Sequence, residues 1–169
     1  MSVTSREERL LSTAIRVTTT TEVNAPAQTL WNQLISVESW PEWSQLHCRV
    51  WGVSPVPVST GTRFRYKIKA YSLCIPTVTV IQELEPARHV QMKMALMGIR
   101  ETHSIRLEPI GSGRTRVTVE LRMWSKFLPL RFVLPSFMIR LLARRWSRDM
   151  KAEAERLHTL AASPQRGTS

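Results

Sequence analysis

The sequence predicts an α+β domain in which a curved antiparallel sheet wraps around a long C-terminal helix, with two short helices after the first strand. Three observations carry this prediction. Seven segments show the alternation of apolar and polar residues that is typical of strands, short turns join six of them in series, and a helical period replaces the alternation near residue 135. Strands joined by short turns are antiparallel, because parallel neighbours need long crossover connections.

The N-terminal region predicts one strand followed by two short helices. Ile15–Val23 is rich in β-branched residues and alternates, so it is expected to be the first strand. Asn24 is a candidate N-cap and Pro26 fits the first turn of a helix, whose apolar residues follow at helical spacing. The segment Trp40–Trp43, which contains a proline, either ends this helix or begins a second one.

The middle of the chain predicts six further strands, and the end predicts one long helix. This helix is expected to begin near Pro135 and to end near Leu160. The 169 residues suit one domain over residues 15–160, with flexible tails at 1–14 and 161–169. The breaks between the strands are rich in Gly, Pro and Ser, as turns are. The six strands are expected at 46–53, 62–70, 77–84, 89–97, 100–108 and 115–124.

One face of the predicted sheet is apolar and the other is polar. Apolar side chains alternate with charged or polar ones along most strands, so the apolar set should face the long helix. The helix presents an apolar stripe toward the same interior. The residues expected on this inner surface are Phe64, Tyr66, Ile68, Val78, Val80, Val90, Met92, Met94, Ile105, Val119, Leu121 and Met123 on the sheet and Phe137, Met138, Leu141 and Leu142 on the helix.

Two ionisable residues interrupt the apolar face. Glu101 and His103 share the strand parity of Ile105, so both side chains should point inward, roughly 6.5 Å apart along the strand. A carboxyl beside an imidazole indicates a functional polar spot in an apolar cavity, with His103 as a candidate acid or base and Glu101 as its partner. The alternative is structural: Glu101 reaches water at the mouth of the sheet, and His103 is a neutral core histidine bonded to a carbonyl or to Tyr66.

Positive charge is concentrated near the C-terminus. The formal net charge is +11, and residues 121–169 hold ten basic and three acidic residues. Such a segment favours an acidic partner surface, such as an anionic membrane, a nucleic acid or an acidic protein. The alternative is a solvated helix face that keeps the protein in solution. The candidate surface consists of Arg140, Arg144, Arg145, Trp146 and Arg148.

Several classes of site have no signature in this sequence. Metal-ligand spacing, phosphate loops and nucleophile motifs are absent, so we expect no metal and no cofactor. Cys48 and Cys74 are too few for a disulfide scaffold and are expected to be free, buried thiols, as in a reducing cytoplasm. No secretory signal is recognisable at the N-terminus, and the apolar stretch 127–143 contains prolines and arginines that argue against a membrane span.

Six different short motifs follow one another along the chain: Val23-Asn24-Ala25-Pro26, Leu30-Trp31, Trp40-Pro41-Glu42-Trp43, Gly61-Thr62, Leu107-Glu108-Pro109 and Gly113-Arg114-Thr115. Together with the long terminal helix they resemble the polyketide cyclase/START-like superfamily, also called SRPBCC, over about residues 15–160. This resemblance implies a helix-grip fold with a cavity for a hydrophobic ligand between sheet and helix. It carries no catalytic residues over, because the superfamily includes carriers, receptors and enzymes. The arginines of the terminal helix depart from the usual pattern.

Three functions follow as hypotheses. A monomeric carrier would hold a lipid, quinone or polyketide against the inner-surface residues and dock by its basic helix on an anionic membrane, as a cytoplasmic protein peripheral to that membrane. A cyclase, aromatase or dehydratase would use His103 as acid or base on a ketide, with Glu101 orienting it and Tyr66 donating to an enolate oxygen. Binding of RNA or an acidic protein has thin support, because Trp146 is the only aromatic residue within the arginine stripe, and nucleic acid is not expected.

Overall fold

The expected strands form one antiparallel sheet in the computed structural model, which describes residues 14–70, 73–125 and 136–163. The strands β2 to β7 each pair with their neighbours in the chain, and β1 pairs with β7, so the order is β1-β7-β6-β5-β4-β3-β2 with β1 and β2 at the edges. Their bounds are β1 Ile15–Val23, β2 His47–Ser54, β3 Arg63–Ala70, β4 Leu73–Glu85, β5 His89–Leu96, β6 Ile99–Pro109 and β7 Thr115–Ser125.

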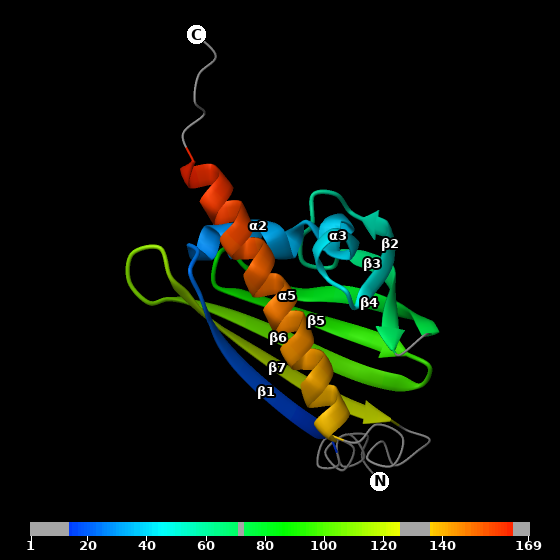
Figure 1. Cartoon of the computed structure of the whole chain (residues 1–169). Coiled ribbons are helices and arrows are strands. Elements are labelled where there is room, and N and C mark those ends of the chain that lie inside the picture. Colours follow the sequence, from blue (N-terminus) through cyan, green and yellow to red (C-terminus); the bar gives the residue numbers. More distant parts are fainter. Residues whose placement is uncertain (1–13, 71–72, 126–135, 164–169) are drawn as a thin grey trace.

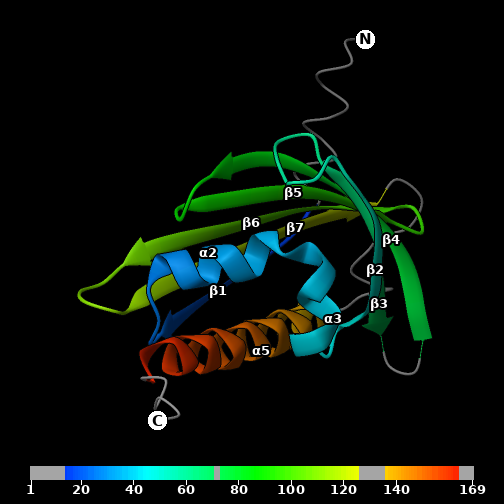
Figure 2. The ribbon, with the colours of Figure 1, turned by 90° about the horizontal axis from the view of Figure 1, so that it is seen from above.

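The helices all lie on the concave face of this sheet. The short helices between β1 and β2 are α2 (Ala27–Ile35), the 3-10 helix η1 (Val37–Ser39) and α3 (Trp40–Trp43), and the long helix α5 (Ser136–Ala162) follows β7. Figures 1 and 2 show α5 crossing the curved sheet, with α2 and α3 beside it. This arrangement confirms the expected helix-grip fold.

Helix boundaries differ in detail from the expectation. Pro26, rather than Asn24, is the N-cap of α2. The backbone N–H of Asn24 instead donates to Glu155 Oε1 at 2.8 Å, which ties the start of α2 to α5. The long helix extends to Ala162, two residues beyond its expected end. The rest of the expected flexible tails, residues 1–13 and 164–169, lies outside the described residues.

The inner face of β4 is shifted by one residue from the expectation. Thr77 and Thr79 are buried, whereas Val78 is 47% exposed and Val80 is only partly buried. The register explains the difference, because Thr79 pairs with the buried Phe64 of β3 and therefore shares its face. The prediction that Val78 and Val80 face inward is wrong, since β-branched threonines fill this face and valines fill the other.

The interior is packed solid beneath α2. Leu30 of α2 and Ile105 of β6 are fully buried, and the space around Ile105 leaves no room for a water molecule. The same end of α5 is equally well buried, with Met150 and Ala154 both at 0% exposure. Gln33 Nε2 donates to the carbonyl oxygen of Met150 at 3.2 Å, which fixes α2 against α5. The interior is therefore filled at this end, and any cavity must lie at the other end, beneath the N-terminal half of α5.

Cys48 of β2 and Cys74 of β4 form a disulfide, so the prediction of free, buried thiols is wrong. Both residues are exposed, and their Cα atoms are 6.6 Å apart, within the usual range for a disulfide. Twenty-six positions separate them in sequence, but the meander brings β2 and β4 to opposite sides of β3. Disulfides persist mainly in oxidising compartments, so the pair argues against the reducing setting, and the cytoplasmic location stays a prediction. Within the described residues, no helix is both long and apolar enough to cross a membrane.

Candidate ligand-binding cavity

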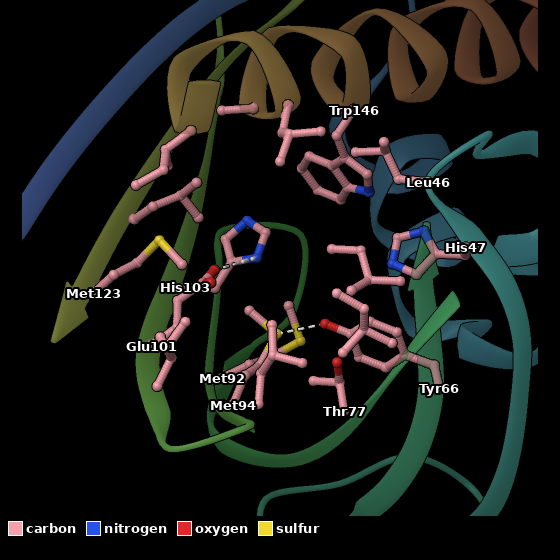
Figure 3. Close-up of a pocket in the computed structure, with 18 of the residues that line it drawn as sticks. Leu46, His47, Tyr66, Thr77, Met92, Met94, Glu101, His103, Met123 and Trp146 are labelled. Atoms are coloured by element: carbon pink, nitrogen blue, oxygen red, sulfur yellow. Dashed lines mark hydrogen bonds and ion pairs between the residues drawn. The ribbon is translucent and has the colours of Figure 1, made fainter. Parts of the chain in front are cut away.

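A cavity of about 420 Å³ lies between the sheet and the N-terminal half of α5. Its volume falls in the range of roughly 300–1,000 Å³ that is common for small-molecule sites. Figure 3 shows side chains from the sheet and from α5 converging on this space. The expected inner-surface and polar residues that line it are Tyr66, Ile68, Met92, Met94, Glu101, His103, Val119, Leu121, Met123 and Leu142.

Eight expected ligand contacts lie elsewhere. Phe64, Val90 and Ile105 belong to the packed core rather than to the cavity wall. Val80 and Met138 are only partly buried and do not line the cavity. These five residues therefore do not contact a ligand in the cavity, contrary to the prediction. The same correction applies to three residues that are largely exposed: Val78, Phe137 and Leu141.

The inner face of α5 is rotated from the predicted one. Its buried apolar residues are Ile139, Ala143, Trp146, Met150 and Ala154, and the first three of them line the cavity. Their spacing of four, three, four and four residues is the regular stripe of a half-buried helix. The prediction assigned the larger apolar side chains of the helix to the inner face. A stripe that contains two alanines has a lower summed hydropathy and was therefore overlooked.

The predicted basic surface has exposed arginines and a buried tryptophan. Arg140, Arg144, Arg145 and Arg148 are exposed on α5, and Arg145 Nη2 donates to Gln45 Oε1. Trp146 is only 5% exposed and packs over the cavity. The role of the arginines toward a partner stays a prediction.

Sequence reasoning also missed several cavity residues outside α5. His47 is the polar member of this group, and its position at the start of a short, irregular strand hid the direction of its side chain. Thr77 was hidden by the wrong parity assigned to β4. The other missed lining residues are apolar: Trp40, Leu46, Ile75 and Ile99.

Glu101 and His103 point into the cavity side by side, as their parity predicted. Glu101 Oε1 lies 3.9 Å from His103 Nδ1, and the two side chains are 17% and 12% exposed. The indole ring of Trp146 meets the His103 ring edge-on, with 5.1 Å between the ring centroids. His103 Nε2 is buried and has no hydrogen-bond partner among the residues that the structure describes. The cavity therefore contains one unsatisfied polar atom next to a carboxyl group.

Burial keeps these groups uncharged at neutral pH. Loss of solvent raises the pKa of the Glu101 carboxyl to about 8, because burial penalises the anion. The same effect lowers the pKa of His103 to about 4, because burial penalises the cation. At pH 7 the pair thus consists mainly of a neutral carboxylic acid and a neutral imidazole.

His47 and Tyr66 form a second polar group of the cavity wall, on β2 and β3. His47 Nδ1 shares a 2.8 Å hydrogen bond with Ser44 Oγ, and burial together with repulsion from His103 lowers its pKa to about 3. The Tyr66 hydroxyl donates to Met94 Sδ at 2.6 Å, and burial followed by the Glu101 charge raises its pKa above the usual value. A thioether sulfur is a weak acceptor, so this bond leaves the Tyr66 hydroxyl only weakly satisfied.

Comparison with protein families identifies the group to which this fold and cavity belong. The family described as polyketide cyclase/dehydrase and lipid transport matches residues 14–162. The chain belongs to this family. Among the described residues of this polyketide cyclase/dehydrase family member, no three His, Cys, Asp or Glu side chains are grouped so that they could hold a metal ion. No curated protein matches the sequence.

Solved structures share the fold of this family member at low sequence identity. A START superfamily protein from Mycobacterium smegmatis is 18% identical with a TM-score of 0.69, over 84% of this chain and 98% of that one. The Zhui aromatase/cyclase from Streptomyces sp. R1128 is 14% identical with a TM-score of 0.71, over 92% and 99%. A Thalictrum flavum norcoclaurine synthase point mutant with a transition-state analogue is 12% identical with a TM-score of 0.67, over 85% and 96%. The family supports hydrophobic ligand binding or cyclase activity, and the solved structures show the shared fold.

Proposed function

We propose that this protein binds a small hydrophobic molecule in the cavity and holds the polar end of that molecule at the Glu101–His103 pair. The observation that supports this most directly is the buried, unpaired Nε2 of His103 in a largely apolar wall. A buried polar atom without a partner costs about 1–3 kcal/mol, so a ligand that supplies the partner recovers that cost. Burial of the ligand's apolar surface adds about 25 cal/mol per Å².

Native mass spectrometry of the purified protein, with solvent extraction of what co-purifies, tests this proposal. A bound lipid, quinone or polyketide is the expected result. Leu121→Trp should fill the cavity and abolish the bound mass, whereas Arg122→Trp, on the exposed face of the same strand, should retain it. A protein that is free of ligand and shows no mass shift with added lipids or quinones would contradict the proposal.

Exchange of the ligand at an anionic membrane is the mode of action we propose. Leu73, Met97, Phe137 and Leu141 are between 61% and 81% exposed. They belong to the start of β4, the β5–β6 turn and the first turns of α5, which lie in the lower right part of the molecule in Figure 1. Met97 also lines the cavity, so this end is its entrance. Exposed apolar side chains near exposed arginines are typical of interfacial binding.

Sedimentation with lipid vesicles tests the membrane proposal. The protein should bind phosphatidylglycerol-containing vesicles, and Met97→Ser with Phe137→Ser should reduce binding at least fivefold. Val56→Ser is the matched control, because Val56 is 72% exposed but lies in the connection between β2 and β3. Equal binding by the double variant and the control would contradict this docking surface.

Acid–base catalysis on a ketide is the second candidate function, favoured by the buried carboxyl–imidazole pair. His103 would transfer the proton, Glu101 would orient its ring, and Tyr66 would donate to an enolate oxygen. A poly-β-keto thioester with the wild type and His103→Ala separates the candidates. An enzyme loses turnover while its affinity stays nearly intact, whereas a carrier loses affinity and shows no turnover with either protein.

A further inference from the structure

The chemistry of the cavity wall restricts which polar group a ligand can carry. We propose that the cavity selects uncharged alcohols or phenols, whose hydroxyl pairs with His103, over carboxylates of the same skeleton. This inference rests on the proposed function, namely that a small hydrophobic molecule occupies the cavity. It goes further because it names the polar group that is accepted and the one that is rejected.

The wall offers no fixed positive charge within the part of the chain that the structure describes. The titratable side chains that face the cavity are His47 from β2, Tyr66 from β3, and Glu101 and His103 from β6, and no lysine or arginine joins them from any described element. A ligand carboxylate would lose its hydration without gaining a cationic partner, and such burial is costly. The ligand carboxylate would also lie near the Glu101 carboxyl. The negative charge of the ligand would keep Glu101 in its protonated form.

A hydroxyl satisfies His103 whichever ring nitrogen carries the proton. The 3.9 Å between Glu101 Oε1 and His103 Nδ1 is too long for a hydrogen bond, so this contact does not determine the tautomer. Nε2 is therefore either a donor or an acceptor. A hydroxyl both donates and accepts, whereas a ketone only accepts and a hydrocarbon does neither. Only the hydroxyl therefore pairs with Nε2 in both tautomers.

The opposite wall offers a competing position that the experiment must separate. Thr77 Oγ1 is also buried and finds no hydrogen-bond partner in the described part of the chain. Figure 3 shows Thr77 beside Tyr66, across the cavity from Glu101 and His103. Unlike His103, Thr77 can be replaced by valine, which has nearly the same shape and lacks the hydroxyl. Thr77→Val is therefore the matched control for a His103 variant.

Isothermal titration calorimetry at pH 7 with 2-naphthol, 2-naphthoate and 2-methylnaphthalene tests the inference on the wild type. We expect 2-naphthol to bind at least tenfold more tightly than either of the other two, because a site with an unpaired polar atom disfavours analogues that cannot pair with it. If 2-naphthoate binds as tightly as 2-naphthol, the inference is wrong. If 2-methylnaphthalene binds as tightly, the inference fails together with the role of the Glu101–His103 pair, but binding of a small hydrophobic molecule in the cavity stands. If none of the three binds, both fail.

The same titrations with two variants locate the hydroxyl. His103→Leu should bring the affinities of 2-naphthol and 2-methylnaphthalene within about threefold of each other, and Thr77→Val should leave the wild-type preference within about twofold. The reverse pattern would place the hydroxyl at Thr77 and overturn the assignment to His103. His103→Gln serves where His103→Leu does not fold, because its amide still donates and accepts and should retain a preference of at least fivefold.

Discussion

The same strands build a packed end and a hollow end of one interior. On β6, Ile105 is fully buried in the core beneath α2, whereas Glu101 and His103 face the cavity beneath α5. On β7, Val117 is 1% exposed in the packed end, and Leu121 further along the strand lines the cavity. Strand parity is identical at both ends, so position along the strand decides whether an inward side chain stabilises the fold or contacts a ligand.

Truncation of one side chain at each end should produce the largest effect and tests the contrast between the packed end and the hollow end. Ile105→Ala should lower the free energy of unfolding by about 3–4 kcal/mol, because the truncation creates a void that the close-packed neighbours cannot fill. Leu121→Ala should cost less than about 2 kcal/mol, because its side chain already borders empty space, but should weaken ligand binding. Urea denaturation of both variants measures the difference, and equal losses would show that the interior is packed alike throughout.

The disulfide should contribute the next largest effect, since it holds the β2–β4 wall of the hollow end. The double variant Cys48→Ser with Cys74→Ser should lower the free energy of unfolding by about 2–4 kcal/mol, as the unfolded chain loses a loop constraint. Dithiothreitol should lower the melting temperature of the wild type and leave that of the double variant unchanged. A wild type that is insensitive to reductant would contradict this role of the bond.

A pH-dependent effect follows from the buried carboxyl group of the hollow end. Glu101 is protonated in the folded protein up to about pH 8 but ionises near pH 4.5 when unfolded, so stability falls as the pH rises through this window. Glu101→Gln removes this loss, and its stability relative to wild type should grow by a few kcal/mol between pH 4.5 and pH 8. The lowered pKa values of His47 and His103 act in the opposite direction below pH 6.5, but both proteins retain them.

Thermal unfolding at several pH values measures this growth. Glu108→Gln is the control, because Glu108 is exposed on the same strand. A constant difference between Glu101→Gln and wild type across the pH range would show that the Glu101 carboxyl is solvated in the folded protein.

Local alternation allowed the strands and the inward pair on β6 to be predicted, because a period of two leaves only one parity for Glu101 and His103. It failed on β4, where Thr77 is inside and Val78 outside, since both are β-branched and hydropathy ranks them in the wrong order. Part of the buried stripe of α5 was missed for a related reason: Ala143 and Ala154 are buried at 5% and 0% exposure, although alanine is a weaker signal of burial than the leucines nearby.

The cavity and the disulfide depend on tertiary distances that no local pattern encodes. Cys48 and Cys74 pair only because β3 lies between their strands and the sheet curves. The hollow lies beside Trp146, whereas Met150, one turn further along α5, is fully buried and does not line it. Inward direction could therefore be predicted for many wall residues, but not which of them border empty space.

The methionine-rich wall makes the cavity chemically sensitive. Met92, Met94 and Met123 line it, and the Met94 sulfur accepts the Tyr66 hydroxyl. Oxidation of Met94 to its sulfoxide would replace a weak acceptor by a strong one and would place a polar S=O group in the wall. Peroxide would thus reduce the capacity of the cavity for apolar molecules, and methionine sulfoxide reductases would restore it.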